Sequence, residues 1–484
     1  MPHWDATTRP NIQPRLGERK NRHANSMVQY QTSGDETRFA PPSCANQSLT
    51  CQLLIVGGGL SGLSAAEAAM RRGADVIVIE RGTFGQEAAS ALNAGQFLTG
   101  WAKPVDVMVD ELTAQEQAKG AAGATARSRA QTRVRAFLRR TVEGCRRLGD
   151  LDRAYNLRSS VRQGAVTAAM TEADLRSLQH TYDFMEKSSF RALMPPVGEQ
   201  RRPFFKLLSA RQLEARCGTA KDIYAGGVID RFGGSFRPRK LLGGLGRTLE
   251  RRGVRIFQQT EAEAVELIDG ELTIYCGNGA QIRASQVFMA NAYARHINAE
   301  AHERNIFSYD YVVVVDLPEG AKTLAAANVL SDTREPCFYA RRHGMRLYMG
   351  YEETADTSPT ITAQVARRTL AEAKRIFPDL HALGENDIKS AWSGRVYYTL
   401  DDYPFVERSL DGRLTTFAAP SDHGNALAVK VGELVGELAA DAVLAGQDAK
   451  RHRDMLQQLK LFEELPKGQR LRPGRRYQAA LEVP

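Results

Sequence analysis

The sequence lacks both closely spaced cysteines and long apolar runs. Its six cysteines form no CxxC pair and no regular framework, which argues against disulfide stapling and against a structural zinc site. No stretch of about 18 residues is both apolar and free of charge, so no transmembrane helix is predicted. The first residues, Met-Pro-His-Trp-Asp, do not begin the apolar segment of a secretory signal. We therefore expect a cytoplasmic protein with reduced thiols and no integral membrane segment.

Motifs of several other protein classes are also missing. The nine histidines include no HxH or HxxxH pair, so we expect no metal site, and no GxSxG segment marks the nucleophile of a hydrolase. The net charge of +9 arises from basic residues scattered along the chain, without the basic stripe and interleaved aromatic residues of a nucleic-acid-binding surface. We predict no nucleic-acid partner.

The composition that remains is typical of a globular protein. Hydrophobic residues make up 43% of the chain and charged residues 25%, which excludes wholesale disorder, a coiled coil and a collagen-like repeat. A length of 484 residues exceeds what one hydrophobic core usually serves, so two domains or one large composite fold are expected. Residues 1–49 are largely polar with several prolines, which predicts a flexible N-terminal extension with Met27 as an alternative start.

A glycine-rich loop between a strand and a helix is the strongest signal in the chain. Gln52–Val56 is an apolar run that predicts a buried strand, and Leu63–Arg72 predicts an alanine-rich helix. Asp75–Glu80 predicts a second buried strand. The loop Gly57–Gly62 connects the first strand to the helix, so these segments together form one strand–loop–helix–strand unit of the kind that binds dinucleotides.

The residues of this loop have separate roles in dinucleotide binding. Gly57 permits the tight turn out of the strand, Gly59 lets backbone amides approach a pyrophosphate, and Gly62 lets the helix pack closely on the strand. The helix begins near Leu60 and Ser61, where unpaired N–H groups and the positive end of the helix dipole would face the phosphates.

The residues beyond the helix narrow the identity of the dinucleotide. Glu80 ends the second strand, 18 residues after Gly62, where an acid accepts hydrogen bonds from ribose hydroxyls. A carboxylate there would repel the 2′-phosphate of NADP. The loop alone does not distinguish NAD from FAD. An NAD dehydrogenase usually continues with further alternating strands and helices, and this chain does not. It continues instead with the small-residue segment Ala88–Gln96, which could run close to the backbone of a ligand, so FAD is favoured.

The remaining pattern mixes short strands with three helices. We predict one long helix over about 104–148, a helix over 362–376 and an alanine-rich helix over 425–444. Strands are predicted over 254–258, 264–268, 271–275, 281–284, 286–289, 309–316, 391–399 and 414–418, with a hairpin about His343-Gly344.

Several segments along the chain carry a resemblance to a known family. They are Ala88–Gln96, Gly226–Pro238, Met289–Tyr293, Trp392–Arg395 with Thr399, Asp401 and Pro404, and Ser421–Gly424. In this order, from about residue 30 to 445, the sequence resembles the FAD-dependent D-amino-acid-oxidase-like amine oxidoreductases. It is most similar to their γ-glutamylputrescine oxidoreductase branch.

The resemblance implies a set of FAD contacts and a non-covalent cofactor. The sarcosine-oxidase branch of the family ties its flavin to a cysteine near the position of Gly394, where this chain has no cysteine. Beyond the glycine loop and Glu80, the implied cofactor-binding residues are Arg81, Ser90, Asn93, Gln96, Ala262 and Gly424. Three positions depart from the family pattern: Leu92 replaces an arginine, and Ala94 and Asp422 replace glycines.

Three residues are predicted to act in catalysis. His423 precedes the helix predicted over 425–444, whose N-terminus would stabilise a reduced flavin, although a surface position beside a helix cap is the alternative. By resemblance, Arg395 stands where related oxidases pair an arginine with a substrate carboxylate, the alternative being a structural salt bridge or a role at the flavin edge. Trp392 is predicted either to pack beside the flavin or to fill the core.

The fold predicted from these features is α/β, with a Rossmann-like FAD-binding domain interleaved with an antiparallel-sheet α+β substrate domain. The FAD-binding domain is expected over 50–150, 222–300 and 390–445, the substrate domain over 151–221 and 301–389, and a C-terminal tail over 446–484. The predicted activity is oxidation of an amine or amino acid at its C–N bond, with oxygen as acceptor and hydrogen peroxide as product. The alternatives are a dehydrogenase of the same fold that passes electrons to a quinone or carrier protein, and a catalytically idle FAD-binding protein.

Overall fold

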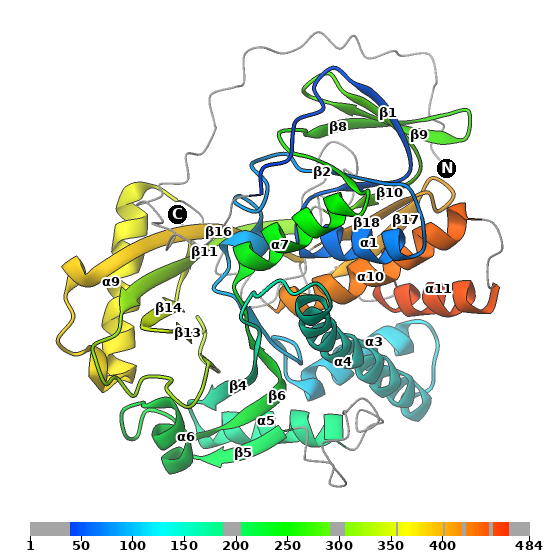
Figure 1. Ribbon diagram of the computed structural model, residues 1–484. Helices are drawn as coiled ribbons and strands as arrows, with labels where there is room; N and C mark the ends of the chain where they lie inside the picture. Colours follow the sequence, from blue (N-terminus) through cyan, green and yellow to red (C-terminus); the bar gives the residue numbers. More distant parts are fainter. Residues whose placement is uncertain are drawn as a thin grey trace.

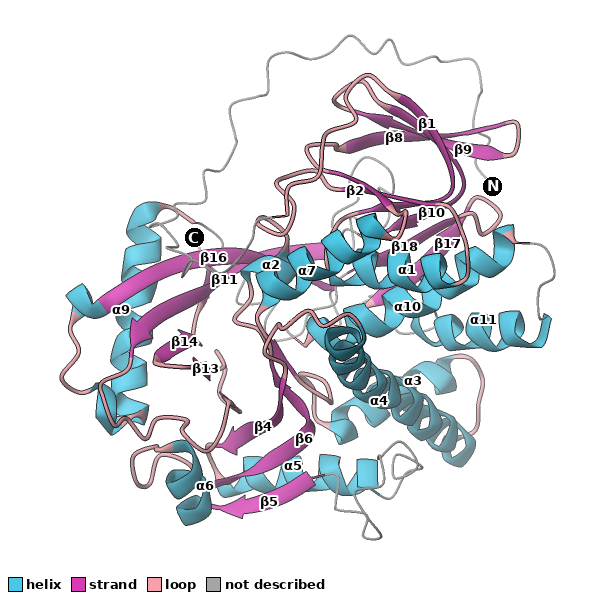
Figure 2. Ribbon diagram, in the orientation of Figure 1, coloured by secondary structure: helices cyan, strands magenta, loops and turns pink. Residues whose placement is uncertain are grey.

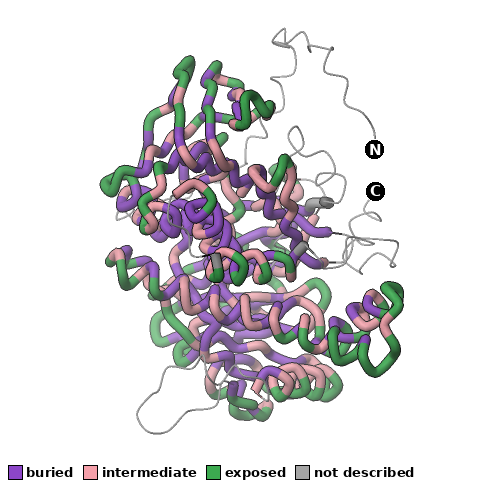
Figure 3. The backbone as a smooth tube through the Cα atoms, turned by 90° about the vertical axis from the view of Figure 1, so that its right-hand side faces the viewer, coloured by how far each residue is buried: buried purple, intermediate pink, exposed green. Residues whose placement is uncertain are grey.

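The computed structural model describes residues 39–186, 205–290, 305–354, 357–399, 402–418, 423–444 and 449–463. Two β-sheets dominate this part of the chain, one at the upper right of Figure 1 and one spanning its left and lower sides. Figure 2 shows helices packed below the first sheet and against the outer side of the second. Buried backbone follows the strands and the inner helices, whereas exposed positions gather at hairpin tips and helix ends (Figure 3).

The first sheet, sheet A, holds the glycine-rich loop. Its order is β17 (Phe405–Ser409), β18 (Leu414–Ala418), β10 (Gln281–Met289), β1 (Ser48–Val56), β2 (Val76–Ile79) and β7 (Arg255–Phe257), and the hairpin of β8 (Ala262–Ile268) and β9 (Glu271–Cys276) pairs with β10. All neighbours from β18 to β7 are parallel, and β17 is antiparallel. The strands predicted separately over 281–284 and 286–289 are one strand, because both halves pair with β1.

Both faces of sheet A are covered. In β1, Leu53 and Ile55 belong to the large core formed with the helices, whereas Leu54 and Val56 belong to a second core formed with the β8–β9 hairpin. This two-sided burial explains why the sequence of β1 is a continuous apolar run instead of an alternating one.

Helices α1 (Leu60–Arg71) and α10 (Gly424–Val443) approach each other unusually closely. A Cβ atom at Gly432 or Gly436 of α10 would lie 2.2 Å from the backbone oxygen of Ser61 or Ala65 of α1, respectively. Glycine is therefore required at both positions. The long helix α4 (Gly123–Ala154) crosses α10 in the same manner, since a Cβ at Gly144 would lie 1.9 Å from the oxygen of Ala426.

The other helices of this layer are α2 (Ala89–Leu92), α3 (Val105–Ala118), α7 (Pro238–Arg251) and α11 (Ala449–Glu463). The prediction of a single helix over 104–148 was wrong. The chain leaves α3 at Lys119, turns at Gly120 with a φ of 91°, and starts α4 at Gly123. Glycine reaches this φ without steric cost, which explains the break.

The second sheet, sheet B, has ten strands among the described residues. Its order is β15 (Glu353–Thr354), β11 (Asn305–Asp316), β14 (Arg346–Gly350), β13 (Tyr339–His343), β12 (Val329–Asp332), β4 (Arg162–Ala169), β6 (Gly226–Ser235) and β3 (Gln96–Phe97), with β16 (Ile388–Thr399) on β11 and β5 (Phe205–Ser209) on β6. All pairs are antiparallel except β12 with β4.

Helices α5 (Glu172–Glu186), α6 (Ala210–Cys217) and α9 (Pro359–Ile376) and the short 3₁₀ turns Pro378–Leu380 and Glu385–Asp387 complete the second layer. The α/β fold with one largely parallel and one largely antiparallel sheet confirms the predicted fold class. The hairpin about His343-Gly344 is also confirmed, as β13 and β14.

Segments from the predicted domain ranges contribute strands to both sheets. Strands β6 and β16, from the ranges 222–300 and 390–445, pair within sheet B. In the range given to the N-terminal extension, Phe39 is buried with its ring 5.0 Å from that of Phe84. Phe462 of α11, in the range given to the tail, is buried against Phe137 of α4. Residues 1–38 and 464–484 lie outside the described residues.

Candidate active site and its cofactor cradle

The glycine-rich loop lies at the carboxyl end of β1, as the sequence predicts. Gly57 has a φ of 115°, and Gly59 is the N-cap of α1. A Cβ at Gly62 would lie 1.9 Å from the backbone oxygen of Gly57, so a side chain there would collide with the loop itself. The backbone N–H of Leu60 donates to Ser90 Oγ at 3.0 Å, which fixes the helix N-terminus against the following small-residue segment.

Glu80 stands at the end of β2 and faces the same loop. Its carboxylate accepts hydrogen bonds from the backbone N–H groups of Gly58 at 2.9 Å and Gly82 at 3.0 Å. Arg81 forms an ion pair with Glu261 at 3.9 Å, and Glu261 directly precedes Ala262, the first residue of β8. The structure therefore gathers Glu80, Arg81 and Ala262 at one edge of sheet A.

The segment from Ala88 to Phe97 connects this loop to sheet B. The side-chain amide of Asn93 donates to the backbone oxygens of Ala89 and Ser90, and its oxygen accepts from the N–H of Gly95 at 2.7 Å. Asn425, in the first turn of α10, donates to the backbone oxygen of Gln96 at 2.6 Å. Asn425 was not among the residues predicted from the sequence. Its place directly after His423-Gly424, at a predicted helix start, was the available signal.

A cavity of about 790 Å³, the site cavity, opens between this segment and sheet B. It brings together six of the predicted residues: Ser90, Asn93, Gln96, Arg395, His423 and Gly424. Ser421 and Asp422 lie outside the described residues. The cavity is also lined by Asp310, Tyr339, Glu353 and Tyr398. Strands were predicted at Asp310, Tyr339 and Tyr398 but not at Glu353, and the direction in which these side chains face could not be predicted.

His423 lies at the N-terminus of α10, on the site cavity. Its ring packs edge-on toward Trp101, with centroids 6.2 Å apart. Burial lowers the pKa of His423 to about 4, so the imidazole is neutral at pH 7. Its Nδ1 atom has no hydrogen-bond partner among the described residues. A buried polar atom of this kind is ordinarily satisfied, which points to a ligand at this position.

Arg395 of β16 is one of three cationic residues that line the site cavity, with Lys103 and Arg334. Its Nε donates to the hydroxyl of Tyr309 at 3.1 Å, and its guanidinium lies 5.6 Å from the centroid of that ring. Burial alone would lower the pKa of Arg395, but hydrogen bonds and electrostatic attraction from Tyr309 and Tyr397 outweigh it and raise the pKa. The guanidinium therefore stays charged at every pH of interest.

Two carboxylates also line the cavity, from strands β11 and β15. Asp310 of β11 and Glu353 of β15 are directly paired across the ladder. Asp310 accepts a hydrogen bond from the Tyr339 hydroxyl at 2.7 Å, and Glu353 accepts one from the Tyr398 hydroxyl at 2.6 Å. The cavity wall thus combines acceptors for a cation with the donor fork of Arg395.

Trp392 lies away from the other two predicted catalytic residues. It is 7% exposed, packs in a cluster with Leu92, Val312 and Tyr348, and donates from Nε1 to the backbone oxygen of Leu92 at 2.6 Å. It is absent from the described residues that line the site cavity and lines a second cavity instead. Of the two predicted positions, the structure favours packing, with Trp392 supporting the segment that carries Leu92.

A glycine-rich loop on one sheet and a mixed-charge cavity against the other are the arrangement expected of a flavin-dependent oxidoreductase. Comparison with known proteins agrees, because the family model of the FAD dependent oxidoreductases (DAO) matches residues 52–438. The chain belongs to this family, and the family membership and enzyme class predicted from the sequence are confirmed.

Two relatives and two solved structures place the chain within the family. It is 27% identical over 433 residues to a probable oxidoreductase OrdL of Rhizobium meliloti (strain 1021), covering 88% of this chain and 89% of the relative. It is 25% identical over 411 residues to the gamma-glutamylputrescine oxidoreductase of Escherichia coli (strain K12), covering 83% and 86%. The fold matches glycine oxidase from Geobacillus kaustophilus (TM-score 0.59, 19% identity, 84% and 98% covered) and L-proline dehydrogenase from P. horikoshii (TM-score 0.63, 17% identity, 84% and 97% covered).

The residues present fit FAD. Gly59 itself adds no side chain at the N-terminus of α1, Glu80 follows β2 beside the loop, and His423 leaves a polar atom unpartnered at the N-terminus of α10. Among the described residues, no helix has the length and apolar character needed to cross a membrane. The same residues contain no group of three or more His, Cys, Asp or Glu side chains placed to hold a metal ion.

Proposed function

We propose that the protein oxidises an amine or an amino acid at its C–N bond, with non-covalently bound FAD and oxygen as the electron acceptor. Bound FAD would accept a hydride from the carbon beside the nitrogen, and water would then hydrolyse the resulting imine. The observation that carries this proposal is the site cavity itself. It places the charged Arg395, the carboxylates of Asp310 and Glu353, and the neutral His423 around one space.

The roles proposed for cofactor binding follow from position. Gly57, Gly59 and Gly62, with Leu60 and Ser61 in the first turn of α1, would hold the pyrophosphate at the positive end of this helix. Glu80 would accept hydrogen bonds from the ribose, and Arg81 and Ala262 would line the adenine side. Ser90, Asn93, Gln96 and Gly424 would surround the flavin ring.

The roles proposed for substrate binding follow from charge. Asp310 and Glu353 attract a cationic amine into the cavity, and Arg395 offers a planar donor fork that suits a carboxylate. His423 is neutral at pH 7, so it does not repel a cationic substrate, while the dipole of α10 favours negative charge at its N-terminus. Relatives named as an oxidoreductase of gamma-glutamylputrescine and fold neighbours named for glycine and proline support nitrogen-bearing substrates.

The proposal of a non-covalent cofactor rests on where cysteines stand. None occurs in β16, the strand that passes the cavity at Gly394 and Arg395. Cys337 lines the cavity from the loop before β13, where its thiol donates to the backbone oxygen of Asp332 at 3.1 Å. Denaturing the purified protein and filtering it tests this directly. FAD in the filtrate is expected, whereas colour retained on the denatured chain would contradict it.

The experiment that tests the function is anaerobic reduction of the flavin by a panel of amines and amino acids, followed by absorbance. Bleaching by one substrate class, and hydrogen peroxide formed at one equivalent per turnover in air, are the expected results. Bleaching of the flavin without formation of peroxide would contradict oxygen as the acceptor and would indicate a quinone or carrier protein instead. Flavin that no member of the panel bleaches would contradict amine oxidation and favour the catalytically idle FAD-binding protein.

A further inference from the structure

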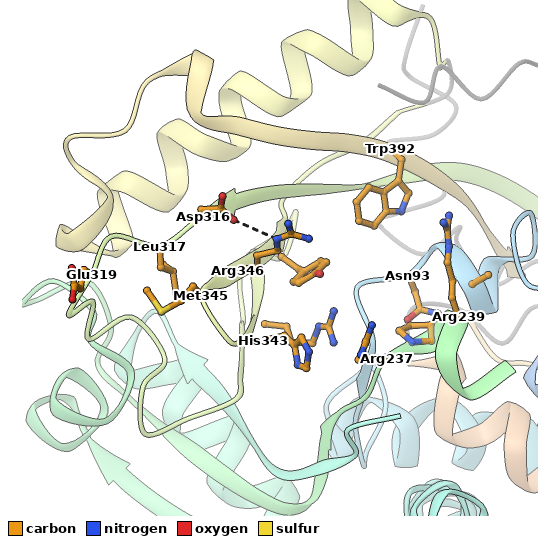
Figure 4. A pocket seen from close by; sticks show the side chains of 14 residues that line it. Asn93, Arg237, Arg239, Asp316, Leu317, Glu319, His343, Met345, Arg346 and Trp392 are labelled. Atoms are coloured by element: carbon orange, nitrogen blue, oxygen red, sulfur yellow. Dashed lines mark ion pairs between the residues drawn. The ribbon is translucent and has the colours of Figure 1, made fainter. Parts of the chain in front are cut away.

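A second cavity, of about 630 Å³, lies beside the site cavity on the other side of Trp392. We call it the basic cavity. It is enclosed by the β13–β14 hairpin, the N-terminus of α7, the end of β11 and residues of α2. In Figure 4, Arg237, Arg239, His343 and Arg346 surround one space, with Trp392 above it. None of the catalytic or cofactor roles proposed above accounts for this cavity.

Its charge is strongly asymmetric. Five basic side chains line it, namely Arg237, Arg239, Arg341, His343 and Arg346, against the two carboxylates of Asp316 and Glu319. Asp316 forms an ion pair with Arg346, Nε to Oδ1, at 3.4 Å, on the exposed rim. The remaining arginines converge from two separate elements, and the N-terminus of α7 adds the positive end of a 14-residue helix.

Arg341 forms the buried side of the basic cavity. It is 4% exposed, donates from Nη1 to the backbone oxygen of Phe236 at 2.6 Å, and lies 4.3 Å from the ring centroid of Tyr348. The bond to Phe236 ties β13 to the residues directly before α7, so Arg341 and Arg237 are held together. An arginine fixed in this way loses little conformational entropy when it binds an oxyanion.

His343 reports the positive potential of the basic cavity. Its pKa is lowered to about 4, first by burial and then by repulsion from Arg341, Arg237, Arg162 and Lys240. Every charged group among these causes is a cation. The imidazole is therefore neutral at pH 7, and a bound anion would make its protonation more favourable.

The site cavity has the opposite character. Seven carboxylate residues line it, against the three cationic residues Lys103, Arg334 and Arg395; the carboxylate residues are Asp174, Asp230, Asp310, Asp332, Glu335, Glu352 and Glu353. The segment around Leu92, held by the Trp392 hydrogen bond, lies between the two spaces, and Asn93 lines both. Two adjacent cavities of opposite charge select ligands of opposite charge, so the basic cavity is not an extension of an amine-binding pocket.

We propose that the basic cavity is a binding site for a small organic ligand that carries two or more oxyanion groups, either phosphates or carboxylates. Guanidinium forks bind both groups bidentately, and the volume is within the range of small-molecule sites. Arg237 and Arg239 bind one end of the ligand from α7, Arg341 and Arg346 bind the other from the hairpin, and Tyr348 and Trp392 contact its organic part.

The test is calorimetric titration of the FAD-loaded full-length protein with pyrophosphate and with citrate, at a fixed ionic strength set with sodium chloride. Saturable binding of at least one probe is expected. The double variant Arg237→Gln/Arg239→Gln should weaken it at least tenfold. Arg251→Gln removes one charge from the exposed end of the same helix, outside the cavity lining, and should leave binding unchanged.

A preference for pyrophosphate would identify a phosphate ligand, and a preference for citrate a carboxylate ligand. Because Arg237 caps α7, the rim variant Arg346→Gln serves as a second probe and should weaken binding independently if the double variant loses its fold. Absence of saturable binding for both probes would overturn the proposal. So would equal weakening by Arg251→Gln, which would mean that net charge alone attracts the anions.

Discussion

Replacing Gly59 by valine should abolish FAD retention while leaving the fold intact. Gly59 has φ −81° and ψ −171°, an extended conformation that any residue adopts. A Cβ there would meet Ser90 Oγ at 3.0 Å and Ser90 Cβ at 3.7 Å, which are atoms of one small side chain at the open edge of the loop. The added methyl groups therefore displace a ligand pyrophosphate more readily than they disturb the core.

The structure supplies a contrasting position three residues later. A Cβ at Gly62 would lie 1.9 Å from the backbone oxygen of Gly57 and 3.2 Å from a methyl carbon of Ile55, and neither the loop nor the strand can move away. Gly62→Ala should therefore cost about 3 kcal/mol or more of the free energy of unfolding, as severe overpacking does. Gly59→Val replaces a favourable N-cap residue by an unfavourable one and should cost about 1 kcal/mol.

The assay measures the two properties separately. The ratio of flavin absorbance to protein absorbance after gel filtration reports FAD retention, and denaturant unfolding of the apoproteins reports stability. Gly59→Val should be colourless with an unfolding midpoint near that of the parent apoprotein, and Gly62→Ala should have a clearly lower midpoint. A Gly59→Val protein that keeps a full complement of FAD would refute the assignment of the pyrophosphate to this loop.

Three other outcomes are expected. Arg395→Lys keeps the positive charge but loses the donor fork of the guanidinium. The value of kcat/KM for a carboxylate-bearing substrate should therefore fall by a factor of about 10 to 100, as expected when charge-assisted hydrogen bonds are lost. An equal fall for an amine without a carboxylate would contradict the binding of a substrate carboxylate by Arg395. His423 has a folded-state pKa of about 4, below its ordinary 6.5, so the unfolded chain binds the proton first and stability falls as the pH drops from 6.5 toward 4. His423→Gln should flatten that part of the curve of unfolding free energy against pH, and an unchanged slope would show that His423 does not titrate in this way. Glu67 is 1% exposed and pairs with Arg71 and Arg147, so Glu67→Gln should lower the free energy of unfolding by about 3 kcal/mol in a denaturant titration. Glu271 forms an exposed pair with Arg283, so Glu271→Gln should lower it by less than about 0.5 kcal/mol in the same titration.

The parts of the fold that depend on local sequence could be predicted well. The first strand–loop–helix unit of sheet A was predicted from the apolar run Leu53–Val56, the glycine loop and the helix after it. This was possible because turn chemistry and continuous apolar strands are properties of short segments. The helix predicted over 425–444 is α10, and the hairpin about His343-Gly344 is β13–β14. The break between α3 and α4 was missed, because Gly120 stands in an otherwise helical pattern.

The parts that depend on pairing between distant segments could not be predicted. The sequences of strands β6 and β16 do not reveal which sheet each strand joins, because their partners are distant in the chain. The same limit applies to the site. Positions on strands were predicted for Tyr339 and Tyr398, but the acidic partners Asp310 and Glu353 became visible only when β11 and β15 were brought side by side.

The geometry of α1 and α10 explains why one ligand should contact both helix N-termini. Ser61 meets Gly432 and Ala65 meets Gly436, so the two helices run parallel and present their positive ends in the same direction. Gly424 begins α10 eight residues before Gly432, which carries its N-terminus about 12 Å beyond the level of Ser61 at 1.5 Å per residue. Ser90 binds the first helix end and Asn425 ties the second to Gln96, so a single segment spans the offset. A ligand with a phosphate group at one end of a flexible chain and a ring that becomes anionic on reduction at the other matches this pair of dipoles, as FAD does.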